Sequence, residues 1–263
     1  WKDSGNSSGL QVNNPPSEPG KVFAVGSAPI IAGSQARAIT QAKEAARLEL
    51  MKQLRVTVSG TTESRTQQTV KGGKSQLTRS LREAVRSQVS NVQLEGIEIT
   101  ETVAHKATES AYAMARLDRA QAEMRLNNRI DELDGRLAGF TDKGRSGSRL
   151  DRLQALMPAL PMLEKRRKLN EQLRMVSERG QGKALPGELD GLEERVLALL
   201  DAVRVTLQAE GDAGKQMESE LVKHLTESGI QAEVGTGGDL QLRYSAELRS
   251  REHDGTHFVI ATG

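Results

Sequence analysis

Near the start of the chain, a short apolar strand precedes a long amphipathic helix. The strand spans residues 21–26, a loop follows over 27–33, and Ser34 opens the helix. Apolar residues then recur at helical spacing on one side, at Ile39, Ala42, Ala46, Leu50 and Leu54. Polar residues occupy the other side, which is typical of a helix that covers a sheet. The small alanine side chains predict a close approach of the two layers.

The next stretch predicts one more helix and three more strands. A strand is expected over 55–70, where alternating valines are followed by a polar half that would form an exposed edge. Apolar spacing predicts a helix over 77–89, and alternation predicts a pair of strands over 94–99 and 110–118. Residues 21–118 are therefore predicted to form a β-α-β-α-β-β module.

Residues 119–201 show only helical periodicity. Three narrow apolar stripes with dense charges between them run through this region: Leu126, Ile130, Leu133 and Leu137; Leu150, Leu153, Met157 and Leu160; and Leu189, Leu192, Val196, Leu199 and Val203. Narrow seams of this kind are typical of coiled coils and helical hairpins. Pro158 and Pro161 predict a kink or break in the second helix. We expect a protruding helical arm.

Residues 202–263 return to mixed helix and strand. The patterns predict a strand, a helix and three further strands, at 203–207, 217–225, 230–234, 240–248 and 256–261. A last strand that stops with the sequence is typical of a truncated module. The expected fold class is α+β, with two small α/β sandwich modules linked by the helical arm. The sheets are expected to be mainly antiparallel, with helices on one face.

Composition limits both the size of the cores and the class of partner. Hydrophobic residues make up 36% of the chain and aromatic residues only 2%, so aliphatic side chains must build modest cores. The net charge of +2, with acidic and basic residues interspersed, argues against a nucleic-acid-binding protein. A run of about 18 apolar residues, as a membrane span needs, does not occur in the sequence.

The first residues and the cysteine count bear on the compartment. Residues 1–20 are rich in Ser, Gly, Asn and Pro and predict a flexible tether, with an ordinary frayed terminus as the alternative. The chain has no cysteine, which favours an exported protein that relies on neither disulfides nor metal clips. Its start at Trp1, without an initiator Met, is typical of a processed product.

Two short motifs superficially suggest a ligand site. Residues 26–34 connect a strand to a helix as a phosphate-binding loop does, but Gly33 stands where such a loop needs a Lys before Ser34. His253 and His257 flank an Asp-Gly pair that by itself explains a hairpin turn, and a third metal ligand is not evident. We therefore predict no metal and no cofactor.

The run Lys165–Lys168 is the densest basic stretch. Glu164 and Glu171 can form ion pairs with it along a helix, so a solvated helix face is the expected role, and contact with anionic lipid or nucleic acid is the alternative. Paired carboxylates, a Ser-His-Asp set and a thiol nucleophile cannot be assembled from the sequence. The protein is therefore predicted not to be an enzyme.

Four segments of the first module carry a family resemblance. They are the strand Val22–Gly26, the alanine-rich helix Ala36–Leu54, the segment Val56–Ser59 and the closing strand Ala111–Asp118. Over residues 21–120 the chain resembles the lipoprotein-20 (FlgP-like) family of outer-membrane lipoproteins. The resemblance implies a periplasmic protein held by acyl chains on a Cys upstream of Trp1, and a role at the flagellum or in another envelope assembly.

The expected function is a non-enzymatic scaffold of the bacterial cell envelope that binds protein partners and self-associates into a closed homo-oligomer. The alternative is a monomeric accessory lipoprotein whose second module activates a cell-wall synthase. A third hypothesis is a metal-dependent hydrolase that uses His253 and His257.

Two surfaces are predicted to make the protein contacts. The first is the polar strand with Thr61, Thr62, Arg65, Gln67 and Thr69, whose edge can pair with another chain. The second is the apolar seam formed by Leu150, Leu153, Met157 and Leu160.

Overall fold

The structure, a computed structural model, describes residues 15–59, 76–89, 94–105, 108–245, 247–253 and 256–262. Contacts divide the chain into two compact units that each combine segments far apart in the sequence. Unit 1 contains residues 1–68, 91–133 and 165–184, and unit 2 contains 69–90, 134–164 and 185–263. The predicted division along the sequence, 1–20, 21–118, 119–201 and 202–263, stays a prediction.

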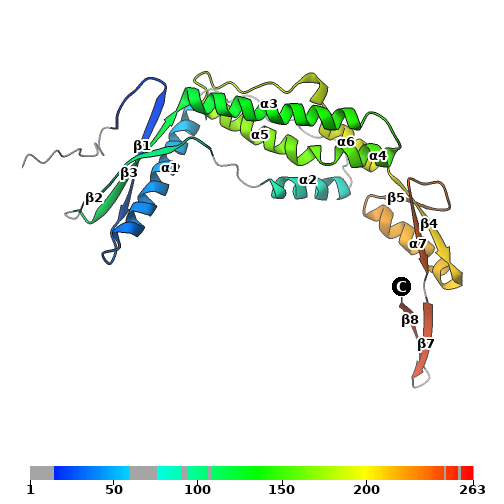
Figure 1. Cartoon of the computed structure of the whole chain (residues 1–263). Coiled ribbons are helices and arrows are strands. Elements are labelled where there is room, and N and C mark those ends of the chain that lie inside the picture. The colour runs from blue at the N-terminus through cyan, green and yellow to red at the C-terminus, as the bar shows by residue number, and fades with distance from the viewer. Residues whose placement is uncertain are drawn as a thin grey trace, which may run out of the picture. The chain divides into compact units, whose positions relative to one another are not determined.

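Unit 1 contains a three-stranded antiparallel sheet. Its strands are β1 (Lys21–Pro29), β2 (Glu98–His105) and β3 (Ser110–Asp118), in the order β1-β3-β2. Helix α1 (Gln35–Ser59) packs on one face of this sheet (Figure 1). The antiparallel sheet expected for the first module is confirmed, but of the two helices expected on it only α1 packs there, because the second, over Gln76–Gln88, belongs to unit 2.

The contact between α1 and the sheet is unusually close at Gly26. A Cβ atom at this position would lie 2.5 Å from the carbonyl oxygen of Ala42 and still closer to the backbone nitrogen of Ala46. Ala38, Ala42 and Ala46 are buried on the facing side of α1. Small residues in both layers therefore allow backbone to approach backbone, as the alanine spacing predicted.

The prediction of a strand over 55–70 is wrong for residues 55–59. Helix α1 continues through Ser59, so Val56 and Val58 are helical. Neither Gly nor Pro interrupts the chain between Leu54 and Ser59, and β-branched residues lower helix propensity only slightly, so nothing stops the helix there. The remainder of that prediction, over 60–70, lies outside the described residues.

The stretch of sequence that follows β3 and precedes β4 is helical, as predicted. Its elements are α3 (Arg119–Lys143), α4 (Arg149–Leu156), α5 (Ala159–Val176), the short 3₁₀ helix η1 (Gly187–Leu189) and α6 (Leu192–Asp201). The break expected at Pro158 is confirmed, since α4 ends and α5 begins on either side of it. Pro161 lies in the first turn of α5, where its missing N–H costs no helical hydrogen bond.

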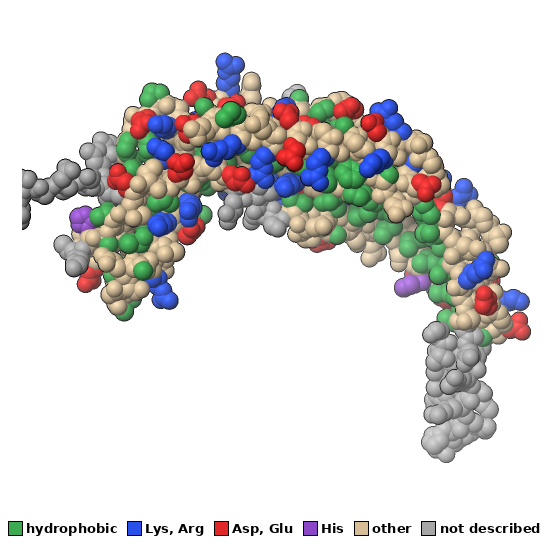
Figure 2. Space-filling model, viewed as in Figure 1, with side chains coloured by type: hydrophobic (Ala, Val, Ile, Leu, Met, Phe, Trp, Pro, Cys, Tyr) green, Lys and Arg blue, Asp and Glu red, His purple; other side chains and the backbone are tan. Residues whose placement is uncertain are grey.

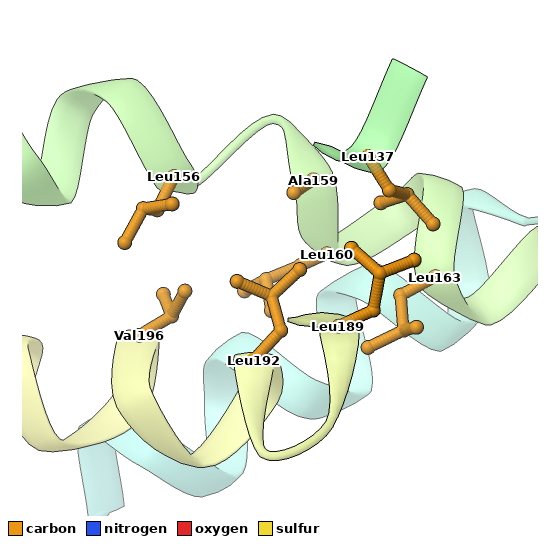
Figure 3. Close-up of a cluster of buried hydrophobic side chains, with 8 residues drawn as sticks. All are labelled: Leu137, Leu156, Ala159, Leu160, Leu163, Leu189, Leu192 and Val196. Atoms are coloured by element: carbon orange, nitrogen blue, oxygen red, sulfur yellow. The ribbon is translucent and has the colours of Figure 1, made fainter. Parts of the chain in front are cut away.

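Unit 2 has a core of eight buried side chains drawn from the helical region. They are Leu137, Leu156, Ala159, Leu160, Leu163, Leu189, Leu192 and Val196, which converge from five elements (Figure 3). Helix α2 (Gln76–Gln88) packs against this core through Leu81 and Val85. A hydrogen bond of 2.8 Å from Thr78 to Asp201 also holds it, as does an ion pair of 2.8 Å between Arg82 and Glu193.

The second sheet, also in unit 2, is parallel. Strand β4 (Arg204–Glu210) lies between β5 (Gln231–Val234) and β6 (Leu240–Ser245), and α7 (Gly211–Glu227) connects β4 to β5. A helical crossover of this kind produces parallel neighbours, so the antiparallel arrangement expected for this module is wrong for these three strands. Beyond them, β7 (Glu247–His253) and β8 (Thr256–Thr262) form an antiparallel pair, so the strand predicted over 240–248 is divided into two.

The connection from β5 to β6 crosses one face of β4. A Cβ atom at Gly238 would lie 2.9 Å from the Cγ2 atom of Thr206, which is buried beneath the connection. A carboxylate oxygen of Asp239 accepts a hydrogen bond of 2.9 Å from the backbone N–H of Arg204 and pairs with the Arg149 guanidinium.

Together, the helices and the small sheets give the chain the predicted α+β class. Within the described residues, no helix is long and apolar enough to cross a membrane.

Candidate protein-binding surface

The first predicted interface is the polar segment over residues 61–69. Thr61, Thr62, Arg65, Gln67 and Thr69 lie outside the described residues. The tether predicted for residues 1–20 is described only from residue 15, and there the carbonyl of Gly20 accepts a hydrogen bond of 2.9 Å from the N–H of Arg119.

The second predicted interface, the seam on α4 and α5, lies in the interior of unit 2. Leu160 is buried in the core, and Leu153 and Met157 pack against it while Leu150 is half-buried. The seam was predicted to contact another chain, but the chain's own helices cover it. The prediction failed because periodicity identifies an apolar face without saying which segment packs on it.

The basic run on α5 is not a uniformly solvated face. Arg166 is only 3% exposed. Its guanidinium donates hydrogen bonds to the carbonyls of Lys183 and Ala184, at 3.3 and 2.7 Å. Arg166 therefore fixes the segment after α5 against the helix, while Lys165 and Arg167 are exposed.

The histidine pair falls in the β7–β8 hairpin, whose antiparallel pairing agrees with the predicted turn. The side chains of His253 and His257 are outside the described set. Among the residues described, no three His, Cys, Asp or Glu side chains are grouped as a metal site would need.

Two polar depressions, of about 580 and 170 Å³, lie among the described residues of unit 1. The larger lies between the start of α3 and the segment after α5. Two of its charged side chains hold these segments together: Arg119 donates to the carbonyl of Val176 at 2.9 Å, and Lys183 pairs with Asp131. We assign no ligand to either depression.

The parallel sheet of unit 2 offers a different kind of surface. Helix α7 begins over the face that carries Ala209 and Tyr244: a Cβ atom at Gly214 would lie 3.3 Å from the Cβ of Ala209, and the Tyr244 hydroxyl donates to the Gly214 carbonyl at 3.2 Å. Burial raises the pKa of the Tyr244 hydroxyl, which keeps this donor protonated. Alternation along the strands places Leu207 on the same face, fully buried.

Three large apolar side chains on this same face remain exposed. The strand register places Val234 beside Leu207 on β5, and Leu240 and Leu242 beside Val205 and Leu207 on β6. They are 53%, 48% and 44% exposed, respectively. We call Val234, Leu240 and Leu242 the apolar rim. The space-filling view shows hydrophobic side chains at the surface of this part of the chain (Figure 2).

The rim is exposed because one helix is too narrow for the sheet. An α-helix about 10 Å across covers roughly two strands spaced about 4.8 Å apart. Helix α7 contacts β4 and β5 and reaches β6 less, and Val234, Leu240 and Leu242 remain partly uncovered. The alternation of these strands is evident in the sequence but their exposure is not, because alternation assigns a residue to a face and does not say how far a helix extends over it.

Comparisons with known proteins leave the chain without an assigned family. It matches no protein-family model, and no curated protein matches it significantly. A secreted protein from the human pathogen Helicobacter pylori, whose crystal structure is known, superposes with a TM-score of 0.47 at 13% sequence identity, over 87% of this chain and 79% of that one. Similarity at this level indicates neither a common function nor a common site.

Proposed function

We propose that the protein is a non-enzymatic scaffold that works through protein–protein contacts, including contacts between its own copies. The observation that carries the proposal is the apolar rim on the parallel sheet. Three large hydrophobic side chains exposed on one sheet face, Leu240 and Leu242 at one border and Val234 at the other, are more than the single exposed apolar residues that any surface has. Burial of their exposed parts would contribute on the order of 1 kcal/mol each to association.

The cellular setting is part of the same proposal. The resemblance of residues 21–120 to the lipoprotein-20 family and the cysteine-free composition support a cell-envelope protein anchored to the outer membrane by an N-terminal lipid. The natural gene product can be tested by cell fractionation and by metabolic labelling with palmitate. Recovery of an unlabelled protein from the cytosol would contradict this setting.

The scaffold function is tested by the mass of the purified chain in solution. Light scattering after size-exclusion chromatography should show assemblies larger than a monomer at high protein concentration. A variant with Leu240→Glu and Leu242→Glu places two charges on the rim. This variant should no longer form the assemblies. The matched control is Leu48→Glu with Met124→Glu, which changes two side chains of similar size that are 62% and 59% exposed in unit 1, and it should behave as the wild type.

Two outcomes would count against the proposal. Equal loss of assembly in the control would show that added negative charge, not the rim, is responsible. A monomer at every concentration would contradict self-association and would favour the accessory lipoprotein that activates a cell-wall synthase.

A further inference from the structure

The parallel sheet has two outer strands that can each accept a further strand. In the described part of the chain, β5 and β6 pair only with β4, on their inner sides. An outer strand presents unpaired N–H and C=O groups along its free edge. Neither strand contains the Pro or Lys residues that commonly block such edges.

The two edges are complementary in the residues that they carry. On the α7 face, β6 offers Leu240 and Leu242 while β5 offers Ala232 and Val234. On the opposite face, the face of Thr206, the only charged residues of these strands are Arg243 on β6 and Glu233 on β5. Both are exposed, and in the described structure neither forms an ion pair.

Pairing of like edges is disfavoured by the same two charges. When two β6 strands meet, the contact brings Arg243 near a second Arg243. When two β5 strands meet, the contact brings Glu233 near a second Glu233. Like charges on adjacent strands destabilise a pair, whereas opposite charges stabilise it. Only the contact between β6 and β5 matches charge with charge and apolar with apolar.

We propose that β6 of one copy pairs in parallel with β5 of a second copy, so that the sheet continues from copy to copy. The proposal rests on the scaffold function and names its self-contact. In the register that brings Arg243 beside Glu233, Leu242 lies beside Ala232 and Tyr244 beside Val234. The direction of all strands is kept, and α7 of every copy covers the same face.

A contact of this type is head-to-tail. Because each copy uses two different edges, the contact is repeated at both ends of the growing sheet and yields a ring or a filament, not an isolated pair. Strand β5 has only 4 residues, so each contact is small and weak in dilute solution. Copies held together on a surface would reinforce one another.

The first test reverses the two charges one at a time in the full chain. Arg243→Glu and Glu233→Arg should each weaken self-association about tenfold or more, because each creates a like-charged contact. A 1:1 mixture of the two variants should recover it, since alternating copies restore the opposite charges at every contact. Sedimentation of the wild type, each variant and the mixture at equal total concentration measures this.

The second test uses the absence of cysteine from the chain. Leu242→Cys and Ala232→Cys place thiols on the two edges. Within one copy, β4 separates these strands by about 10 Å, which is too far for a disulfide. Mild oxidation of a 1:1 mixture should give a dimer that contains one copy of each variant, and oxidation of either variant alone should not.

The outcomes separate this contact from the scaffold function. If the wild type assembles and the rim variant does not, but the mixture of charge variants fails to recover, the edge pairing is wrong and the scaffold proposal stands. Dimers of Leu242→Cys alone would indicate pairing of β6 with β6 and would also overturn the head-to-tail contact. A wild type that remains monomeric, together with a mixture of the two cysteine variants that gives no dimer, overturns both.

Discussion

The two three-stranded sheets are each covered by one principal helix, but the two pairs of sheet and helix differ in how completely they are closed. Helix α1 meets the antiparallel sheet through alanines and Gly26, and Ala24, Ala113 and Leu117 are almost fully buried between them. Helix α7 meets the parallel sheet over fully buried Leu207, yet the apolar rim beside it is half exposed.

The difference shows what small residues contribute to a two-layer contact. Where Gly and Ala face one another, the layers come close enough to exclude water along the helix, and the large exposed apolar residues described in unit 1 are scattered as Ile31, Leu48 and Met124. Where larger side chains border a narrow helix, apolar surface remains uncovered. The closed contact of α1 with the antiparallel sheet is suited to stability, and the open contact of α7 with the parallel sheet is suited to binding.

Gly26→Val tests the close contact between α1 and the antiparallel sheet most directly. The added Cβ would overlap the backbone of α1 at Ala42 and Ala46, so the helix must move away from the sheet. We expect a loss of at least about 3 kcal/mol in the free energy of unfolding, or no folded unit 1. Thermal unfolding followed by circular dichroism measures it. The control is Gly135→Ala, where a Cβ meets nothing within 4 Å and helix propensity should add about 0.5–1 kcal/mol.

The second prediction contrasts two leucines on the same face of the parallel sheet. Leu207→Ala removes a fully buried side chain from β4 and should cost about 2–5 kcal/mol in the free energy of unfolding. Leu242→Ala, on the adjacent strand, should cost less than about 1 kcal/mol because its side chain is already 44% exposed. Denaturant unfolding of the two variants at low protein concentration compares them. Equal losses would mean that the rim is buried in solution.

The third prediction concerns the connection that crosses β4. Gly238→Ala would place a methyl group 2.9 Å from both the carbonyl oxygen of Arg204 and the Cγ2 atom of Thr206. We expect a loss of about 1–3 kcal/mol in the free energy of unfolding. The combination of Gly238→Ala with Thr206→Ser removes one of the two clashing groups and should recover part of that loss. If the double variant recovers no stability, the added methyl group clashes with the backbone alone.

The smallest expected effect is a pH dependence at Asp239. The hydrogen bond from the Arg204 N–H holds the pKa of the Asp239 carboxyl below its ordinary value of about 3.9. Because the folded-state pKa is lowered, the charged carboxylate stabilises the fold above the unfolded-state pKa, and this contribution is lost as pH falls through the folded-state pKa.

The test of this effect compares the wild type with Asp239→Asn. The difference between their free energies of unfolding should be constant above about pH 5 and should decrease as the solution is acidified below about pH 4. A difference that does not change with pH would mean that the negative charge of Asp239 does not contribute to the free energy of unfolding.

Local pattern was sufficient for much of the fold. The spacing from Ile39 to Leu54 predicted α1 and its close approach to a sheet, and Pro158 predicted the break between α4 and α5. It failed at Val56, where β-branched residues suggested a strand, because a helix that is already formed continues until something stops it.

The candidate site was less accessible from the sequence. The seam around Leu153 and Met157 was identified correctly as apolar, but it packs on the core of unit 2. Conversely, Leu240 and Leu242 were recognised only as members of a strand, and their exposure was not foreseen. Exposure depends on which segments pack together, and these segments are distant in the chain.

Local sequence alone specified the class of most segments, because helical and strand periodicities and prolines act over a few residues. The tertiary structure alone decided that β4, β5 and β6 run parallel, that the α4–α5 seam is interior and that the rim of the second sheet is open. These properties depend on where α2 and α7 pack and how far they extend over their neighbours. No local pattern records that, because contacts between distant segments are set by the shapes of both partners.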